Sequence, residues 1–273
     1  MTPAIVRAPA LLDATLATIP EGFMPLWHGG HRIGAVSPAW QGLLGSGPFT
    51  TEMRGGQRQG HLKDGGPALQ RWAQAQKAAG MLPGWRNEAI EIFGPDPRGA
   101  LFEVERALLR PLGLLLRTVQ VNVYTLRQGV PWLWCARRAA HKPVDPGLMD
   151  SLVAGGIGVG ETPLSTLFRE AAEEAALPGH LSRRALPTGI MDSVHLAQEG
   201  EASVLHRERM HVFDLQVPED FVPAHPDGET EHARLLSLDE VLAQIRNGLW
   251  TREGAWAGIN LIDRWQRGDL RVR

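Results

Sequence analysis

Hydrophobic and polar positions alternate most regularly in the middle of the chain. The segment VQVNVYTL, residues 119–126, places apolar side chains at every second position, as expected of a half-buried strand. The segment PWLWCARR, residues 131–138, repeats this spacing after Gln128 and Gly129, so the two segments are predicted to form a hairpin. A later strand is predicted over residues 210–216.

Helical spacing of apolar positions is found on both sides of this strand region. Thr162 is a good N-cap and Pro163 a good first residue for a helix that Pro178 and Gly179 would end. Ser237 is the predicted N-cap of a later helix. The other segments with helical spacing are residues 10–18, 68–79, 102–109 and 238–245.

The first part of the chain has a different pattern. Short apolar runs at residues 23–27 and 33–36 flank the turn at 28–30 and are predicted to pair as strands. The glycine-rich polar stretch 55–66 is predicted to be a loop. The change of pattern near residue 117 predicts a small α+β domain over residues 1–117, followed by a larger α/β domain in which helices flank a mixed sheet.

Composition narrows the function classes. The chain has 273 residues, 43% of them hydrophobic, and a net charge of -2, so it can bury a core and carries no basic field for nucleic acid. Its single cysteine, Cys135, excludes an intrachain disulfide. The N-terminus lacks a secretory signal pattern, and no apolar run is long enough to span a membrane. A cytoplasmic protein that binds neither nucleic acid nor membrane is expected, and a homodimer is left open.

The most informative stretch is GGIGVGETPLSTLFREAAEEAAL, residues 155–177. On the predicted helix, Glu170, Glu173 and Glu174 stand at i, i+3 and i+4, so their carboxylates share one face. Carboxylates this close repel one another unless a cation neutralises them. Oxygen ligands favour Mg²⁺ or Mn²⁺, and such ions are commonly shared with substrate phosphates. A metal-dependent phosphate enzyme is therefore predicted, although a solvated acidic helix would show part of the same pattern.

The same stretch resembles the Nudix box, G-x5-E-x7-R-E-U-x-E-E-x-G-U with U aliphatic. The matching residues are Gly155, Glu161, Arg169, Glu170, Ala171, Glu173, Glu174 and Leu177, and Ala176 stands where the family has glycine. The resemblance implies an α/β/α sandwich that hydrolyses a diphosphate linkage of a small-molecule substrate with Mg²⁺ or Mn²⁺.

The resemblance also assigns roles within the box. It implies that Glu170, Glu173 and Glu174 hold the metal, together with the backbone carbonyl of Gly155. Arg169 is expected to orient a box glutamate. Glu161 is expected to have a similar supporting role, and a plain surface position near a helix start and direct metal contact are both left open.

Further catalytic and binding residues are expected outside the box. Members of the family often take a water-activating base from another loop, and Glu229 or Glu231 could serve as that base or as an additional metal ligand. Arg137, Arg138 and Lys142 precede the box and are candidates to bind the distal phosphate, against the alternative that each is a solvated surface cation. The histidines, His206 and His211 included, show no metal-ligand spacing with a cysteine.

Three longer segments resemble one branch of the Nudix family, the thiamin-pyrophosphokinase-related proteins with an N-terminal domain of unknown function. The segments are FMPLWHGGHRIGAVSPAW, LVAGGIGVGETPLSTLFREAAEEA and VFDLQVPEDFVPAHPDGETE. The resemblance implies hydrolysis of thiamin diphosphate, or of its oxidised or damaged analogues, to the monophosphate. It also implies an N-terminal domain over residues 1–117, a Nudix domain over 118–258 and a C-terminal helix or tail over 259–273.

Two other functions fit the same residues. A Nudix hydrolase of ADP-ribose or of a dinucleotide would keep the box and differ only in the residues that recognise the substrate. A non-catalytic diphosphate-binding module would keep the fold, although the intact glutamates argue against it.

Overall fold

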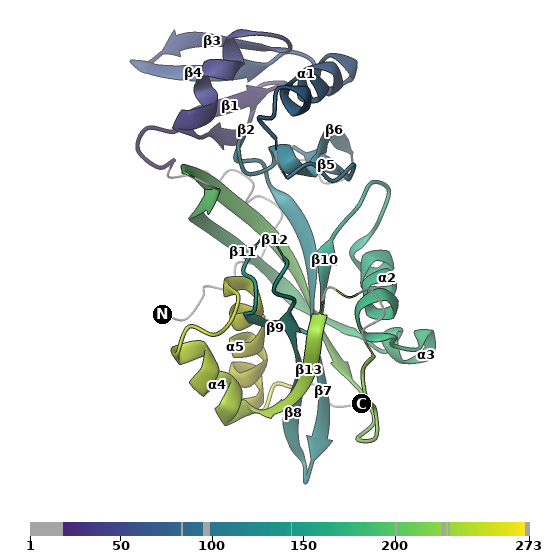
Figure 1. Cartoon of the computed structure of the whole chain (residues 1–273). Helices are drawn as coiled ribbons and strands as arrows, with labels where there is room; N and C mark the ends of the chain where they lie inside the picture. The colour runs from purple at the N-terminus through teal and green to yellow at the C-terminus, as the bar shows by residue number, and fades with distance from the viewer. Residues whose placement is uncertain are drawn as a thin grey trace.

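The computed structural model describes residues 19–82, 84–94, 99–142, 144–199, 201–224, 228 and 230–270. The predicted helix at 10–18 and the candidate base Glu229 lie outside these residues. Within them the chain forms two regions: an N-terminal one with its own small sheets, and a larger one built on a long, strongly curved sheet (Figure 1). The expected mixed α/β fold class is thereby confirmed.

The N-terminal region is a four-stranded sheet covered by one helix and a separate hairpin (Figure 1). The strands at 23–27 and 33–36 and the helix at 68–79 are confirmed within one or two residues. The elements are β1 (Met24–His28), β2 (His31–Val36), a 3-10 helix (Pro38–Gly45), β3 (Phe49–Arg54), β4 (Gln57–Leu62), α1 (Pro67–Ala78), β5 (Ala89–Phe93) and β6 (Ala100–Glu105), in the sheet order β2-β1-β4-β3 with β5 paired to β6.

Two sequence predictions in this region are wrong. The stretch 55–66 is not a loop, because Gly55 and Gly56 make a tight turn with positive φ and the polar strand β4 then pairs with β3. Residues 102–109 do not form one helix: β6 pairs with β5 and buries Phe102 and Val104, and a 3-10 turn at Arg106–Leu108 follows. In both segments strand pairing outweighs the local signal from which the prediction was made.

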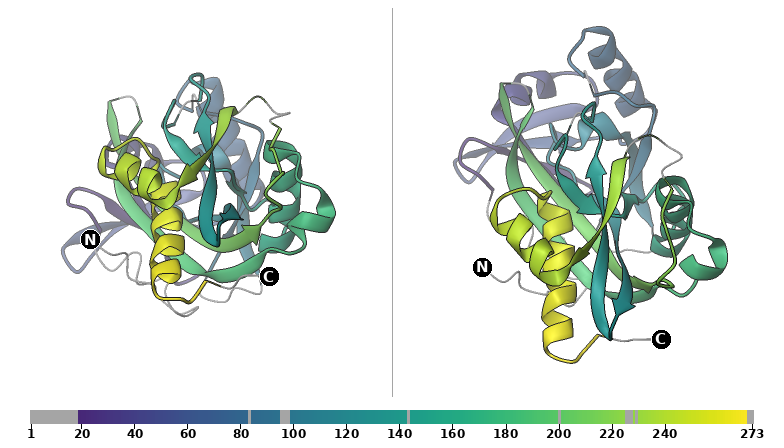
Figure 2. Two further views of the ribbon diagram at one scale, coloured as in Figure 1. Left: turned by 90° about the horizontal axis from the view of Figure 1, so that it is seen from below. Right: turned by 60° about the horizontal axis from the view of Figure 1, so that its bottom comes forward.

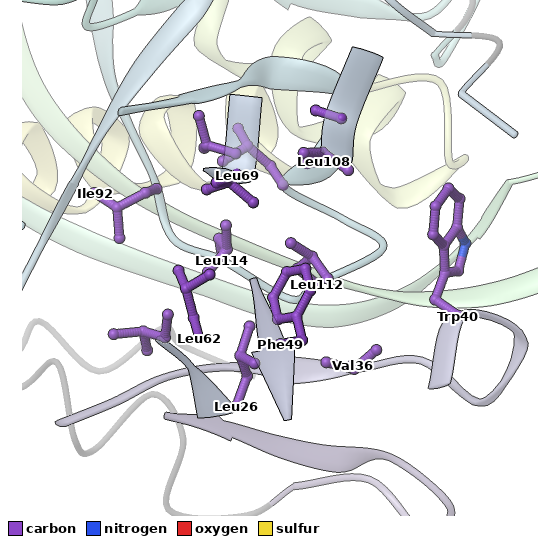
Figure 3. Close-up of a cluster of buried hydrophobic side chains, with 14 of the residues drawn as sticks. Leu26, Val36, Trp40, Phe49, Leu62, Leu69, Ile92, Leu108, Leu112 and Leu114 are labelled. Carbon is purple, nitrogen blue, oxygen red and sulfur yellow. The ribbon is translucent and has the colours of Figure 1, made fainter. Parts of the chain in front are cut away.

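The N-terminal region has a hydrophobic core of its own. Figure 3 shows Leu26 of β1, Phe49 of β3, Leu62 of β4 and Leu69 of α1 directed toward one another. Leucines from the stretch just before the long sheet, including Leu112 and Leu114, complete this cluster. The core therefore spans the N-terminal region up to the point where β7 begins.

The larger region is organised by a seven-stranded mixed sheet in the order β11-β12-β7-β8-β13. β10 pairs with one end of β7, and β9 pairs with β8. The hairpin of β7 and β8 confirms the alternating pattern, whereas β11 was not predicted. The strands are β7 (Leu116–Arg127), β8 (Val130–Arg138), β9 (Met149–Ser151), β10 (Val153–Gly156), β11 (Leu186–Glu199), β12 (Ala202–Gln216) and β13 (Thr230–Ser237).

Helices cover both faces of this sheet, as the two views of Figure 2 show. On one face, α2 packs against alternate β7 residues such as Val119 and Val121. On the other face, α5 packs against Met210 and Val212 of β12. The helices are α2 (Pro163–Ala175), the short α3 (Gly179–Ser182), α4 (Leu238–Arg246) and α5 (Arg252–Gln266), so the expected boundary at residue 259 falls inside α5.

The ends of these helices confirm the capping predictions. The hydroxyl of Thr162 accepts from the backbone N–H of Ser165, and Pro163 opens α2. Ser237 caps α4 in the same way. α2 ends at Ala176, which takes the left-handed conformation, with φ of 49°. Ala176 therefore adopts the backbone conformation that normally favours glycine at this position.

The two regions meet through backbone contacts that admit no side chain. A Cβ on Gly34 of β2 would lie 2.3 Å from the carbonyl oxygen of Leu112, and one on Gly113 would lie 2.3 Å from that of Ala35. Beside this crossing, the fully buried Arg207 of β12 donates to the carbonyl oxygens of Ile33 (2.9 Å) and Gly113 (2.8 Å). A charged hydrogen-bond donor of the large sheet thus holds the N-terminal region in place.

None of the helices in the described residues combines the length and apolar character that crossing a bilayer requires.

Candidate active site

The box residues meet where α2 packs on β10 at the edge of the large sheet. Gly155 of β10 lies beside Glu170 of α2, and a Cβ on Gly155 would be 1.9 Å from Glu170 Oε1. Any side chain at position 155 would displace this carboxylate. The glycine that opens the box is therefore needed so that the helix can bring its first glutamate onto the strand.

Arg169 joins three carboxylates of this site. Its Nη1 donates to Glu170 Oε1 at 2.8 Å and to Glu173 Oε2 at 3.1 Å. Its Nε and Nη2 donate to the two oxygens of Glu161 at 2.8 and 3.0 Å. Glu170 and Glu173 thus converge on one cationic nitrogen, and the bidentate contact with Glu161 fixes the guanidinium plane. We call Glu161, Arg169, Glu170 and Glu173 the box cluster.

The box cluster places two carboxyls in opposite electrostatic conditions. Hydrogen bonds from Arg169, Gly158 and Thr166 lower the pKa of Glu161 to about 2, so this carboxylate is a permanent anchor for the arginine. Burial raises the pKa of Glu170 to about 7 although Arg169 opposes the shift. Additional positive charge beside Glu170 would favour its ionised form, and a divalent cation would supply that charge.

Glu174 is directed to the strand rather than to Arg169. Its Oε2 accepts from the backbone N–H of Ala154 at 2.8 Å. The structure therefore brings Glu161, Glu170 and Glu173 together around Arg169, whereas Glu174, the residue after Glu173, is directed to β10.

The candidate residues outside the box have other neighbours. Arg137 and Glu231 form an exposed ion pair with each other at 3.2 Å. Arg138 donates to Asp150 at 3.1 Å and to the carbonyl oxygen of Val144, so it fastens the loop that leads to β9. The backbone N–H of Lys142 closes a turn onto Ala139 in that loop. No described contact joins Arg137, Arg138 or Glu231 to the box cluster.

A second group of ionisable side chains lies on the opposite face of the sheet. His206 and Glu208 of β12 and Glu253 of α5 place one ligand atom each within 4.8 Å of one another, and no other set of three His, Cys, Asp or Glu side chains does so in the described part of the chain. We call these three residues the buried cluster. Three neighbours donate hydrogen bonds to this cluster. Thr118 donates to Glu208 at 2.7 Å, Ser193 to Glu253 at 2.6 Å, and Arg110 to His206 Nδ1 at 3.2 Å.

The bond from Arg110 decides what the buried cluster can do. An arginine keeps its proton, so His206 Nδ1 accepts and its Nε2 carries the hydrogen that is directed at Glu208, 3.1 Å away. Nε2 therefore has no free lone pair for a metal, and Arg110 occupies the lone pair of Nδ1. Burial and the charge of Glu208 raise the pKa of Glu253, whereas the hydrogen bonds from His206 and Thr118 lower that of Glu208. The arrangement is a closed hydrogen-bond network that shares protons.

Sequence reasoning did not single out the buried cluster. The available signal was the run HRERMH, which puts His206 and Glu208 at alternate positions of a strand that is apolar before and after the run. Charged residues buried in such a strand require partners. Those partners come from Arg110 and Glu253, far away in the sequence, so periodicity could not find them.

The comparison with family models matches the NUDIX domain to residues 116–253. This range begins with β7 and contains the whole box. The chain is 33% identical over 167 residues to "Nudix hydrolase 24, chloroplastic" and 32% identical to "Nudix hydrolase 20, chloroplastic", both of Arabidopsis thaliana. Each alignment covers 61% of this chain and 45% or 44% of the plant protein, so the chain spans less than half the length of these relatives.

Among solved structures, the crystal structure of DR0079 from Deinococcus radiodurans is similar with a TM-score of 0.47 and 20% identity. The match covers 63% of this chain and 98% of that one.

Proposed function

The chain belongs to the NUDIX domain family, and from that premise we propose that it is a metal-dependent hydrolase of the diphosphate linkage in a small molecule. The observation that carries this proposal is the convergence of Glu170 and Glu173 on one cationic nitrogen, 2.8 and 3.1 Å away. Two acidic side chains that already meet at one positive charge suit a divalent ion bound by a few carboxylates.

The residues fit such an ion. Glu170 and Glu173 would hold Mg²⁺ or Mn²⁺, with Glu174 and the Gly155 carbonyl as further ligands. Bound there, the ion would offset charge on the phosphoryl oxygens and make water a better nucleophile. Arg169 orients Glu170 and Glu173, and Glu161 holds Arg169 in place with two hydrogen bonds.

The base that activates water is proposed to be Glu229 or Glu231. Glu231 would have to leave its exposed ion pair with Arg137, which costs little because both groups are solvated. Arg137 and Lys142 are proposed for the distal phosphate. A role for Arg138 requires it to release Asp150 and Val144, so we place it last of the three.

For the substrate, we propose thiamin diphosphate or its oxidised analogues, cleaved to the monophosphate. The support is the resemblance of three segments, two of them outside the box, to the thiamin-pyrophosphokinase-related branch. ADP-ribose and dinucleotides are the second candidate, since the same box would serve them. A cytoplasmic location stays a prediction, because both plant relatives are named chloroplastic.

The domain division is likewise a proposal. The hydrophobic cluster of the N-terminal region consists entirely of residues between Met24 and Leu116, which supports a boundary near residue 117. The NUDIX match begins at residue 116. We infer an N-terminal domain, a Nudix domain up to about residue 258 and a C-terminal segment that continues α5.

Product analysis tests the proposal. The purified full chain with Mg²⁺ or Mn²⁺ is offered thiamin diphosphate, its oxidised analogues, ADP-ribose and NADH, and the phosphate-containing products are identified. We expect a thiamin-type monophosphate from wild type and none from Glu173→Gln. Cleavage of ADP-ribose or NADH alone would keep the hydrolase and discard the thiamin substrate. Metal binding without turnover of any compound would favour a binding module.

A further inference from the structure

Arg117 lies on the same sheet face as the box cluster. In the register of the sheet, Gly155 of β10 pairs with Val119 of β7, and His211 of β12 pairs with the same Val119. Paired residues share a face, and so do alternate residues of one strand. Arg117 therefore lies on the sheet face that Glu170 covers at Gly155. Along β7 it is two residues from Val119, which is a distance of about 7 Å.

The guanidinium of Arg117 has a stacking partner but no hydrogen-bond acceptor among the residues that the structure describes. It lies 4.4 Å from the centre of the Phe93 ring, at the end of β5 in the N-terminal region. Stacking uses the flat face of the group and leaves its N–H donors, which lie in the plane, available. Burial lowers the pKa of Arg117, and the charge of Glu91 only partly opposes this shift. A half-buried cation without an acceptor is costly unless an anion joins it.

The neighbours of Arg117 on this face are already neutral or paired. Arg209, which stands opposite Arg117 in the sheet register, makes a bidentate ion pair with Asp192 at 2.7 and 2.8 Å. Burial lowers the pKa of His211 to about 4, so its ring is neutral, and its buried Nε2 has no partner in the described structure. Arg117 is thus the cation left to bind an anion here, and His211 offers a second polar atom.

We propose that Arg117 binds a phosphoryl group of the diphosphate substrate, held in position by Phe93 of the N-terminal region. The donor fork of arginine matches phosphoryl oxygens, and its place on the same sheet face as the box glutamates suits the phosphate whose charge the metal does not offset. This inference rests on the proposed function and adds a substrate-binding residue to it. It also gives the N-terminal region a part in the site, because Phe93 belongs to the β5–β6 hairpin.

Binding of a non-hydrolysable diphosphate tests this inference. The probe is methylenediphosphonate with Mg²⁺, titrated calorimetrically into the full chain and into Arg117→Met and Arg117→Lys. We expect Arg117→Met to weaken binding on the order of 10-fold or more, the usual effect of losing a hydrogen bond to a charged group. The affinity of Arg117→Lys for the probe should lie between those of wild type and Arg117→Met, because lysine keeps the charge and loses the planar set of donors. In turnover assays, KM should rise more than kcat falls.

Arg127 supplies a matched control. It lies at the other end of the same strand and also stacks on an aromatic ring, that of Trp132, at 4.8 Å. Arg127→Met should bind the probe as wild type does. Arg117→Met should unfold at the wild-type temperature or above it, since the cation it removes has no described acceptor. A lower melting temperature with unchanged probe binding would show that Arg117 is structural.

The outcomes separate this inference from the proposed function. If wild type hydrolyses diphosphates and Arg117→Met binds the probe equally well, the inference is wrong and the hydrolase stands. If wild type neither binds the probe nor hydrolyses any compound, both fail. Loss of binding confined to the Arg117 variants would establish the residue as a substrate ligand.

Discussion

The box cluster and the buried cluster lie on opposite faces of one sheet and respond differently to the same problem, the repulsion between neighbouring carboxylates. In the box cluster a single arginine faces three carboxylates, and Glu173 is half exposed, with 52% of its side chain accessible. In the buried cluster, His206 and Glu208 are each 9% accessible and Glu253 is 13% accessible, and hydroxyl and imidazole donors accompany the two carboxyls.

The difference shows what makes an acidic cluster available to a metal ion. The buried cluster contains a histidine and two glutamates at suitable spacing, yet Arg110 uses the histidine lone pair, and burial together with the charge of Glu208 raises the pKa of Glu253, which disfavours a second negative charge there. The box cluster has three carboxyl groups for the single charge of Arg169, and it leaves Glu173 open to solvent. Residue types and distances alone would favour the buried cluster, whereas the hydrogen-bond partners favour the box.

The largest expected effect separates the two clusters by activity. Glu173→Gln removes a proposed metal ligand without filling or emptying the core. Mutation of a residue that only supports a metal ligand typically lowers metal affinity or activity by about 10–100-fold. Loss of a ligand itself should therefore lower kcat/KM by about 100-fold or more. Steady-state kinetics measures the loss of kcat/KM, and thermal unfolding checks that the stability is unchanged. Near-wild-type turnover would remove Glu173 from the site.

The next effect separates them by stability. Glu208→Gln exchanges a buried carboxylate that accepts from Thr118 and His206 for an amide that suits them poorly, and should destabilise by about 2–3 kcal/mol. Glu253→Gln is the matched control and should cost less than about 1 kcal/mol, because Glu253 is the carboxyl with the raised pKa and already holds a proton more readily. Urea unfolding compares the two. Equal losses would contradict this distribution of charge.

A smaller effect concerns pH at the buried cluster. The His195 ring lies 4.8 Å from that of His206, and burial lowers its pKa from 6.5 to about 4. The unfolded chain therefore takes up this proton first, so the contribution of His195 to stability is full above about pH 6.5 and is lost as the pH falls from 6.5 to 4. The melting temperature of His195→Gln should fall less than that of wild type between pH 7 and pH 4.5. Parallel curves for the two proteins would rule this out.

The smallest effect returns to the end of the box helix. Ala176 has φ of 49°, where a Cβ costs roughly 1 kcal/mol relative to glycine. Ala176→Gly should therefore stabilise the protein by about 0.5–1 kcal/mol and leave turnover unchanged, since Ala176 follows the last box glutamate. Chemical unfolding and kinetics of the single variant suffice. A destabilised or less active variant would show that the methyl group is needed.

The fold was predictable where local signals and strand pairing agree. The β7–β8 hairpin, α1 and the capped starts of α2 and α4 follow from alternation, amphipathic spacing and the side chains of Thr162 and Ser237. The predictions failed at β4 and β6, where a polar strand and a helix-like segment obtain their conformation from partners. β11 was missed because its apolar residues do not alternate regularly with polar ones and most of its side chains are exposed or half-buried.

The site was predictable only within the box. Spacing on a single helix predicts that Glu170, Glu173 and Glu174 lie close together on α2, because no other part of the chain is needed for this. In the structure Glu170 and Glu173 meet at Arg169, whereas Glu174 accepts from Ala154 of β10. Contacts between distant segments were not predictable. Arg117 contacts Phe93 of the N-terminal region, and Arg110 donates a hydrogen bond to His206, which is distant in the sequence and near only in the folded chain.

The tie made by Arg207 has a consequence for how the molecule opens. The N-terminal region has its own core, yet separating it would strip a buried guanidinium from the carbonyls of Ile33 and Gly113 before water could reach any of the three. Partial opening at this junction is therefore disfavoured. Amide hydrogens in β2 and β12 would then exchange together, in one cooperative event, and the two cores would behave as a single folding unit.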